Sequence, residues 1–260
     1  MSTMAHRTAT GFRALVLLCG CMVLSAEAAT FSINPLRVEL GARQRTEVIT
    51  LKNTADAPLR LQVRTMLWKV ADDGQWQLTP SKDLIVTPEL TEVPAGGAAQ
   101  FRVGTLLEPG ASEASYRLII DELPSIDSAA DAQSQIKVLT EISMPVFLEP
   151  AKRTRQPALE SAALDHGVLK LALGNGGTQR LDPQAVKVTV LDEGGQVLEQ
   201  QAATANYILP GRSAFLSVKL SADACRRAAA VSVTWPDLAN TSLTHAINAD
   251  ARACAAATSP

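Results

Sequence analysis

The chain has 260 residues, of which 47% are hydrophobic and 19% are charged, with a formal net charge of −2 at pH 7. This length is typical of two domains of about 100 residues each, once an export segment is removed. Because acidic and basic residues are interspersed and nearly balanced, the sequence offers no strong field for nucleic acid and no polybasic patch for a membrane surface. A partner must therefore be recognised by shape.

The first 28 residues have the pattern of an export signal. Arg7 and Arg13 supply a positive start, residues 14–24 form an apolar core, and Ala26-Glu27-Ala28 is a small-residue cleavage pattern. The apolar core is well below the about 20 residues that a membrane-spanning helix needs. We therefore expect a cleaved signal peptide over residues 1–28, export to the periplasm and no membrane insertion.

The four cysteines fall into two pairs. Removal of the signal peptide takes away Cys19 and Cys21 and leaves Cys225 and Cys254 in an oxidising compartment, where we predict one disulfide. A rival interpretation of the N-terminus is a lipoprotein signal with a lipidated Cys21, although the apolar run continues past that residue. Neither remaining cysteine has a Cys or His at ligand spacing, so metal binding is disfavoured and we expect no cofactor.

From residue 31 onward, short strand patterns alternate with turns, and almost nothing repeats at helical period. Asp72-Asp73-Gly74 is a good hairpin signal because glycine supplies the positive φ of a tight turn. About seven strands in about 120 residues is typical of an immunoglobulin-like sandwich. The expected strands are 31–33, 37–40, 47–51, 60–70, 76–79, 99–106 and 116–123, followed by a long run from 135 to 150.

The second half repeats this rhythm of strands and turns after a short basic segment, residues 151–156, that is bracketed by prolines. We interpret this segment as a linker between an N-terminal domain over 29–150 and a C-terminal domain over 157–260. The sequence thus predicts an all-β protein of two sandwich domains. The strands expected in the second domain are 168–173, 186–191, 197–201, 214–220, 231–235 and 241–247.

The run from Gln135 to Pro150 alternates apolar and polar residues for longer than one ordinary strand requires. A long apolar edge is usually suppressed because it recruits other chains. We interpret this run as an edge whose function is to recruit another chain. The residues that share its apolar face are Ile136, Val138, Ile142, Met144, Val146 and Leu148.

The sequence predicts no enzyme. His166 and His245 stand outside any metal or nucleophile motif, and there is no phosphate loop or dinucleotide fingerprint. Arg37 is the charged residue that most needs explaining, since it lies between Leu36 and Val38 in an otherwise apolar strand. Two interpretations of Arg37 stay open, a solvent-facing arginine or an anchor that holds a carboxylate through two parallel hydrogen bonds.

Four pieces of the chain stand out by their order and spacing: FSINPLRV at 31–38, LKNT at 51–54, YRLIIDELP at 116–124 and the long alternating strand. Together they resemble the periplasmic chaperones of the chaperone-usher pathway, PapD-like proteins that assemble pili in Gram-negative bacteria, and are most similar to the archaic branch. The resemblance implies two immunoglobulin-like domains in an L-shaped arrangement, a non-enzymatic chaperone function, and pilin subunits and an outer-membrane usher as partners.

What this family implies is donor-strand complementation. A pilin is an immunoglobulin-like fold that lacks its last strand, and the chaperone lends its G1 strand to fill the gap. Main-chain hydrogen bonds add the strand, and alternate side chains enter the open core of the partner. The resemblance places the donated side chains at Ile136, Val138, Thr140 and Ile142.

The resemblance also places the anchor for the C-terminal carboxylate of the pilin at Arg37. The second cation of the family anchor, a lysine on G1, falls on Pro145, which cannot serve. Two alternatives stay open: one cation suffices, or Lys152, Arg102 or another base replaces the lysine. Glu149 stands where many members have an arginine, and we expect the interdomain ion pair of those members to be absent or inverted.

The alternative from another class is an exported two-domain adhesive or carbohydrate-binding β-sandwich protein. Such a protein would need a cluster of aromatic side chains, yet aromatic residues make up only 4% of the chain. Trp68, Trp76 and Trp235 are separated in sequence, which favours the chaperone over this alternative.

Overall fold

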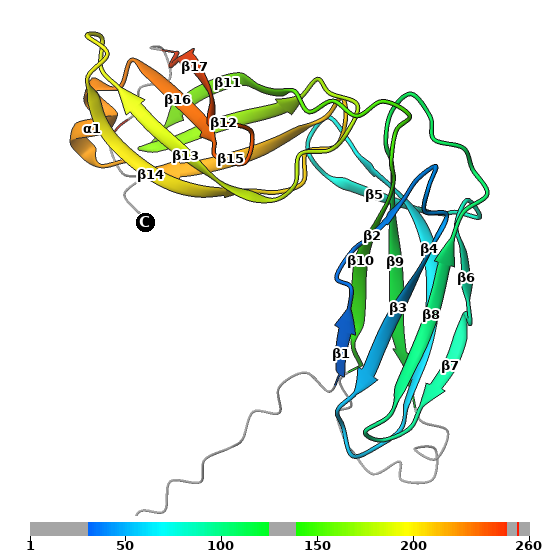
Figure 1. Ribbon diagram of the computed structural model, residues 1–260. Helices are drawn as coiled ribbons and strands as arrows, with labels where there is room; N and C mark the ends of the chain where they lie inside the picture. Colours follow the sequence, from blue (N-terminus) through cyan, green and yellow to red (C-terminus); the bar gives the residue numbers. More distant parts are fainter. Residues whose placement is uncertain (1–30, 125–138, 249–253, 255–260) are drawn as a thin grey trace, which may run out of the picture.

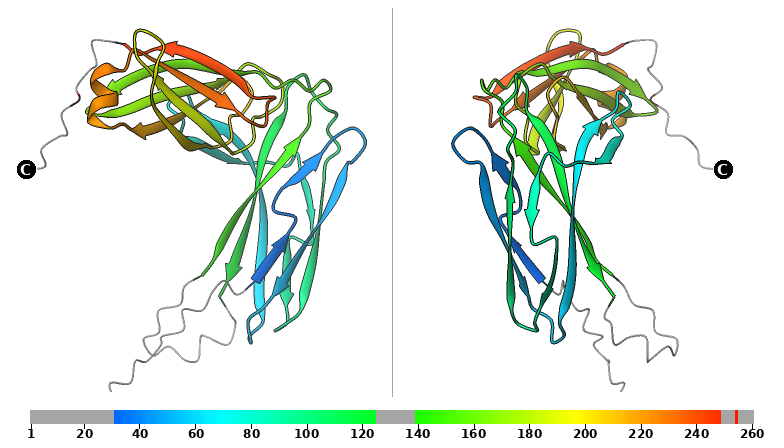
Figure 2. Two further views of the ribbon diagram at one scale, coloured as in Figure 1. Left: turned by 60° about the vertical axis from the view of Figure 1, so that its left-hand side comes forward. Right: turned by 90° about the vertical axis from the view of Figure 1, so that its right-hand side faces the viewer.

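A computed structural model describes residues 31–124, 139–248 and 254. It contains two β-sandwiches set at an angle to each other, as an L (Figure 1). Two further views show that one end of the C-terminal sandwich meets one end of the N-terminal sandwich (Figure 2). The predicted all-β, two-sandwich fold is confirmed. The expected signal peptide, Ile136 and Val138 lie outside the described residues.

The N-terminal sandwich consists of a four-stranded and a six-stranded sheet. The strands of the first sheet, in spatial order, are β1 (Phe31–Asn34), β3 (Thr46–Asn53), β8 (Ala98–Gly104) and β6 (Ile85–Thr87). Those of the second are β2 (Val38–Leu40), β10 (Glu141–Leu148), β9 (Ala114–Leu123), β4 (Leu59–Val70) and β5 (Trp76–Pro80), with β7 (Leu90–Val93) also paired to β4.

The core of this sandwich is formed by the alternate residues that point between the two sheets, as the period-2 pattern predicts. β9 and β10 supply Leu118, Ile120, Met144 and Val146, each at most 2% exposed. The opposite parity of β9 and β10 faces away from this core. It forms the outer surface on which the charged residues of the candidate site lie.

The first strand of the chain changes sheets within a few residues. β1 pairs with β3 in the four-stranded sheet, whereas β2 pairs with β10 in the other sheet. Between them the Asn34–Pro35 peptide bond is cis. Because the segment is divided in this way, β2 has only three residues to pair with β10.

The C-terminal sandwich packs a three-stranded sheet against a four-stranded one. Its buried core includes Trp235, Leu171 and Val188, each at most 1% exposed. The first sheet contains, in spatial order, β11 (Pro157–Asp165), β12 (Val168–Asn175) and β15 (Ser213–Lys219). The second contains β14 (Val197–Ala205), β13 (Gln184–Leu191), β16 (Ala230–Trp235) and β17 (Thr241–Ala246), with the short helix α1 (Ala222–Arg227) between β15 and β16.

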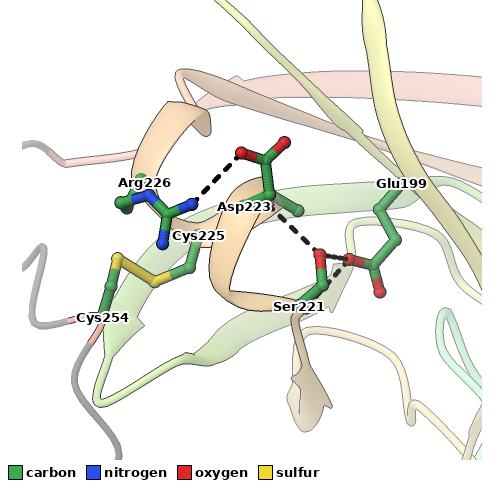
Figure 3. The surroundings of a disulfide bond; sticks show 7 residues. Glu199, Ser221, Asp223, Cys225, Arg226 and Cys254 are labelled. Carbon is green, nitrogen blue, oxygen red and sulfur yellow. Dashed lines mark hydrogen bonds and ion pairs between the residues drawn. A yellow bond between two sulfur atoms is a disulfide. The ribbon is translucent and has the colours of Figure 1, made fainter.

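The predicted disulfide is present between Cys225 of α1 and Cys254, at a Cα–Cα distance of 5.7 Å (Figure 3). Ser221 caps this helix by accepting a hydrogen bond from the backbone N–H of Ala224. Cys225 is fully buried, so the bond joins Cys254 directly to the core of the second sandwich.

A buried asparagine ends one strand in each domain, Asn53 at the end of β3 and Asn175 at the end of β12. Nδ2 of Asn53 donates to the carbonyl oxygens of Ala57 and Val93, at 2.8 and 3.1 Å. Nδ2 of Asn175 donates to those of Gln179 and Ile208, both at 2.9 Å. Each side chain thereby fixes the turn that follows its strand. The two carbonyl groups that accept from Asn175 are buried, where carbonyl oxygens need hydrogen-bond donors.

Candidate functional site

One edge of the six-stranded sheet is only partly covered. β2 pairs with β10 in parallel over Val146 to Leu148 alone, whereas β9 pairs with it over the whole of Glu141–Leu148. The described part of β10 before Val146 therefore has a neighbour on one side only. This edge lies on the inner side of the angle between the domains (Figure 1).

The hydrogen-bond pattern shows which backbone groups face this free edge. The N–H of Glu122 donates to the carbonyl oxygen of Thr140 at 2.9 Å, which makes the even-numbered positions of β10 the hydrogen-bonded partners of β9. The N–H groups of Glu141 and Ser143 therefore point away from β9, toward the free edge. Pro145 lacks an N–H group at the next such position, as is usual for a proline at a strand edge.

The side chains along this edge change from buried to exposed toward its N-terminal end. Met144 is 2% exposed, Ile142 is half-buried against the core, and Thr140 is exposed. Leu139, of the opposite parity, is 42% exposed. Of the four expected donor residues, the structure describes Thr140 and Ile142. Ile142 lies on the face of β10 that continues the core of the sandwich, and Thr140, directly before β10, has the same parity.

A row of three residues crosses the outer face of the sheet at the point where the pairing with β2 begins. Pro145 is opposite Arg117 of β9, and the parallel register of β2 places Arg37 beside Pro145, one residue before the Val38–Val146 pair. Val38 and Val146 are both fully buried, so Arg37, Pro145 and Arg117 lie on the face away from the core. Two arginines therefore flank the proline that replaces the expected lysine.

Arg37 is paired with carboxylates of both domains. Its Nε lies 3.1 Å from Oε1 of Glu39, and its Nη1 lies 3.1 Å from Oδ1 of Asp182 in the C-terminal domain. The side chain of Arg37 is 44% exposed. Arg37 is thus at the junction of the domains, where the carboxylate-anchor interpretation requires it, but it is already occupied.

Arg117 differs from Arg37 because no carboxylate pairs with it in the described part of the chain. It is 5% exposed, and its guanidinium carbon lies 3.9 Å from the ring centre of Trp68 and 4.4 Å from that of Trp76. Nη1 donates to the carbonyl oxygen of Ser143 at 3.3 Å, while the buried Nε has no partner among the described residues. Burial lowers the pKa of Arg117 to about 10, which leaves it a cation at neutral pH.

A second buried arginine, Arg180, joins the two domains. It lies between β12 and β13, is 1% exposed, and its Nη1 is 2.6 Å from Oε2 of Glu113, which precedes β9. Arg180 also contacts Glu39, and its guanidinium carbon lies 3.7 Å from the ring centre of Phe147. Burial raises the pKa of Glu113 to about 7, against the opposing effect of Arg180.

These contacts answer the expectation about Glu149. An interdomain ion network is present, with its carboxylates Glu39 and Glu113 on the N-terminal domain and its buried arginine on the C-terminal domain. Glu149 is not part of it and pairs with Arg153 of the linker. An inverted ion pair was one of the two expected outcomes, and here the arginine comes from the C-terminal domain and the carboxylates from the N-terminal domain. The sequence did not indicate that Glu39, Glu113 and Arg180 would be the residues involved.

The two named substitutes for the missing lysine do not join the row at Pro145. Arg102 lies on β8, in the opposite sheet. The backbone carbonyl of Lys152 accepts a hydrogen bond from Thr178, and its side chain is exposed. Arg117 is the cation that the sequence analysis missed, although its place in the strand beginning at Tyr116 put it on the outer face.

The structure also corrects the argument from the separation of the tryptophans. Trp68 and Trp76 pack with their ring centres 4.9 Å apart and their planes tilted by 58°, and Phe147 and Tyr207 join them in one cluster. Trp68 and Phe147 are at most 2% exposed, and Arg117 lies against both indoles. Trp76 is 49% exposed at the edge of the cluster. Because the other indole and Phe147 are buried against Tyr207 of the C-terminal domain, the cluster mainly packs the two domains together and is not an open aromatic platform for sugars.

Comparison with known proteins places the N-terminal domain in a family. Residues 30–153 match the family model of the N-terminal domain of PapD, a pili and flagellar-assembly chaperone. This part of the chain is a PapD-like domain. A search of curated proteins finds no match. Among the described residues of the protein, no helix is long and apolar enough to cross a membrane.

Solved chaperone structures share this fold. One chain of the CsuC–CsuE chaperone–tip adhesion subunit complex, from archaic Csu pili of Acinetobacter baumannii, is 21% identical, and the match covers 84% of this protein and 98% of that chain, with a TM-score of 0.53. One chain of the Salmonella enterica complex of SafA pilin with the SafB chaperone is 15% identical, covers 81% and 91%, and has a TM-score of 0.52. At these identities the likeness shows the fold alone.

Proposed function

We propose that this protein is a periplasmic chaperone that binds pilin subunits by donor-strand complementation, keeps their open core from aggregating and delivers them to an outer-membrane usher. The observation that carries the proposal is the free edge of β10, where the N–H groups of Glu141 and Ser143 point away from β9. A strand of the pilin that pairs there would complete the ladder.

The donor side chains would supply most of the favourable free energy. Burying an aliphatic side chain such as Ile136, Val138 or Ile142 in a pilin contributes about 1.5 to 3 kcal/mol before the cost of ordering the strand. Ile142 already packs partly against the core of the chaperone, so its gain would be smaller than that of the other two. The groove of the pilin would therefore be filled mainly by the part of the strand before Thr140.

The anchor for the C-terminal carboxylate of the pilin would be the pair Arg37 and Arg117. The resemblance supports Arg37, and Arg117 is supported by its Nε, which has no partner among the described residues, and by the lack of a carboxylate beside it in that part of the chain. Neighbouring strands are about 4.8 Å apart, so the two arginines begin about 10 Å from each other across β10. Of the two, Arg117 would contribute more, because a buried cation that no described carboxylate neutralises gains most from an incoming one.

The donor strand can be tested by co-expression with candidate pilins, chosen as any small secreted proteins that the adjacent open reading frames encode. Thr140→Asp puts a charge on the donor face at an exposed position, so the chaperone should fold but no longer co-purify with a pilin. Leu139→Asp is the matched control, since it adds the same charge one residue away on the opposite face. Equal recovery of pilin with wild type, Thr140→Asp and Val138→Asp would refute donation by this strand.

The anchor is tested by the affinity of the purified chaperone for the same pilin. Arg117→Met should weaken binding by about 30-fold or more, the effect expected for one partner of a buried charge pair. Arg37→Ala should weaken it less, by about twofold to fivefold, because Arg37 is half exposed. Arg64→Met is the control, since Arg64 lies on the same outer face but is paired with Asp121 at 2.8 Å. Wild-type affinity in Arg117→Met would remove Arg117 from the anchor.

A further inference from the structure

We infer that Asp182 of the C-terminal domain occupies the carboxylate anchor of the free chaperone and has to be displaced from Arg37 when a client binds. This inference rests on the proposed function and concerns the regulation of the same site. Arg37 holds two carboxylates at once, Glu39 from its own domain and Asp182 from the other domain. The side-chain carboxylates of Glu39 and Asp182 are thus the same chemical group as the C-terminal carboxylate of a client.

Asp182 is the partner that can be exchanged. It is 26% exposed, and its other contacts are to Nε of Arg180 at 2.9 Å and to Nη2 of Arg155 at 3.8 Å. Arg155 and Arg180 would still neutralise the carboxylate of Asp182 after Arg37 has bound the carboxylate of a client. Glu39 lies in the same domain as Arg37, so release of Glu39 from Arg37 would not loosen the junction between the domains. Glu39 would keep its contact with Arg180 of the C-terminal domain.

Displacement of Asp182 links client binding to the contact between the domains. In the free protein, the bond from Arg37 to Asp182 is one of the ion pairs that join β2 to the C-terminal domain. A client carboxylate that takes Arg37 breaks this pair, so the intramolecular contact competes with the client. Removing the competitor should increase client affinity, by about twofold to fivefold for a half-exposed ion pair.

Asp182→Asn tests the inference, because asparagine keeps the size of the side chain and an oxygen that can accept from Arg180. The probe is a synthetic peptide of the last residues of the pilin that co-purifies with the wild-type chaperone, made with a free carboxylate and with an amidated end. Calorimetry should show about twofold to fivefold tighter binding of the free-carboxylate peptide and unchanged binding of the amidated one. In an Arg37→Ala background, Asp182→Asn should change neither affinity.

Asp72→Asn is the matched control. Asp72 forms another ion pair between the domains, to Arg212 at 2.8 Å, but does not touch Arg37, so peptide affinity should stay at the wild-type value. Unchanged or weaker binding in Asp182→Asn, with pilin co-purification intact, would overturn this inference and leave the proposed function standing. Absence of any pilin from the wild-type preparation would overturn both.

Discussion

Arg180→Met should lower the free energy of unfolding by about 3 to 5 kcal/mol, the usual cost of removing one partner of a buried ion pair. Arg180 is 1% exposed and the side chain of Glu113 is fully buried, with 2.6 Å between Nη1 and Oε2. Methionine would fill much of the space beside Phe147 but would leave Glu113 without its cation. The loss of stability thus comes from the carboxyl group of Glu113, which is buried and is left either protonated or charged without a cation beside it.

A double variant separates this electrostatic cost from lost packing. Glu113→Gln combined with Arg180→Met removes both charges, and the pair together should cost less than Arg180→Met alone. Arg212→Met is the control for an exposed interdomain ion pair, since Arg212 is 42% and its partner Asp72 is 98% exposed. This control should change stability by no more than about 0.5 kcal/mol.

The assay is urea denaturation followed by tryptophan fluorescence. Trp68 and Trp76 report on the N-terminal domain and the junction, and Trp235 reports on the core of the C-terminal domain. Separate transitions for the two domains in Arg180→Met would show that the junction couples them. A loss in Arg180→Met no larger than that in Arg212→Met would refute the account of the junction.

Three other predictions concern stability. Burial raises the pKa of Glu113 from 4.5 to about 7, so between these values the folded protein keeps a proton that the unfolded chain releases. The free energy of unfolding should therefore rise as the pH falls from about 7 to about 5. Glu113→Gln should abolish this rise, as measured by urea denaturation at a series of pH values. Cys254→Ser opens the bond to Cys225 across a separation of 29 residues and should cost about 3.6 kcal/mol in non-reducing denaturation, whereas an equal midpoint for both proteins would argue against a constraint on the unfolded chain. Asn175→Ala should cost about 2 to 4 kcal/mol because two buried carbonyl groups lose their donor, while Asn206→Ala, at an exposed site, should stay within about 0.5 kcal/mol.

The strands with clean alternation were predictable from the sequence, and the others were not. β4 and β9 are close to their expected ranges because part of each strand alternates clearly and turn residues bound it. The alternating parts are Leu59, Leu61 and Val63 in β4 and Tyr116, Leu118 and Ile120 in β9. β11 was missed because its middle, Glu160 to Ala163, has little alternation, and its pairing with β12 shifts register between Leu159 and Ser161. The helix α1 has six residues, too few for a helical period to show.

The candidate site divides in the same way. The disulfide was predictable because only two cysteines remain after the signal peptide. The contact of Arg180 with Glu113 joins residues 67 apart in sequence and depends on how two domains meet, which no local pattern encodes. The place of Arg117 beside Pro145 depends on the register of β9 and β10, and its contact with Trp76 depends on two further strands.

The central claim is that the free edge of β10 pairs with a client. Hydrogen exchange at the backbone N–H groups of Glu141 and Ser143, measured in the free chaperone and in its purified complex with a pilin, tests this claim most directly. The account predicts fast exchange in the free protein and strong protection in the complex, because both groups would donate to the client strand. Equally fast exchange in a stable complex would contradict the account, since the client would then be bound elsewhere.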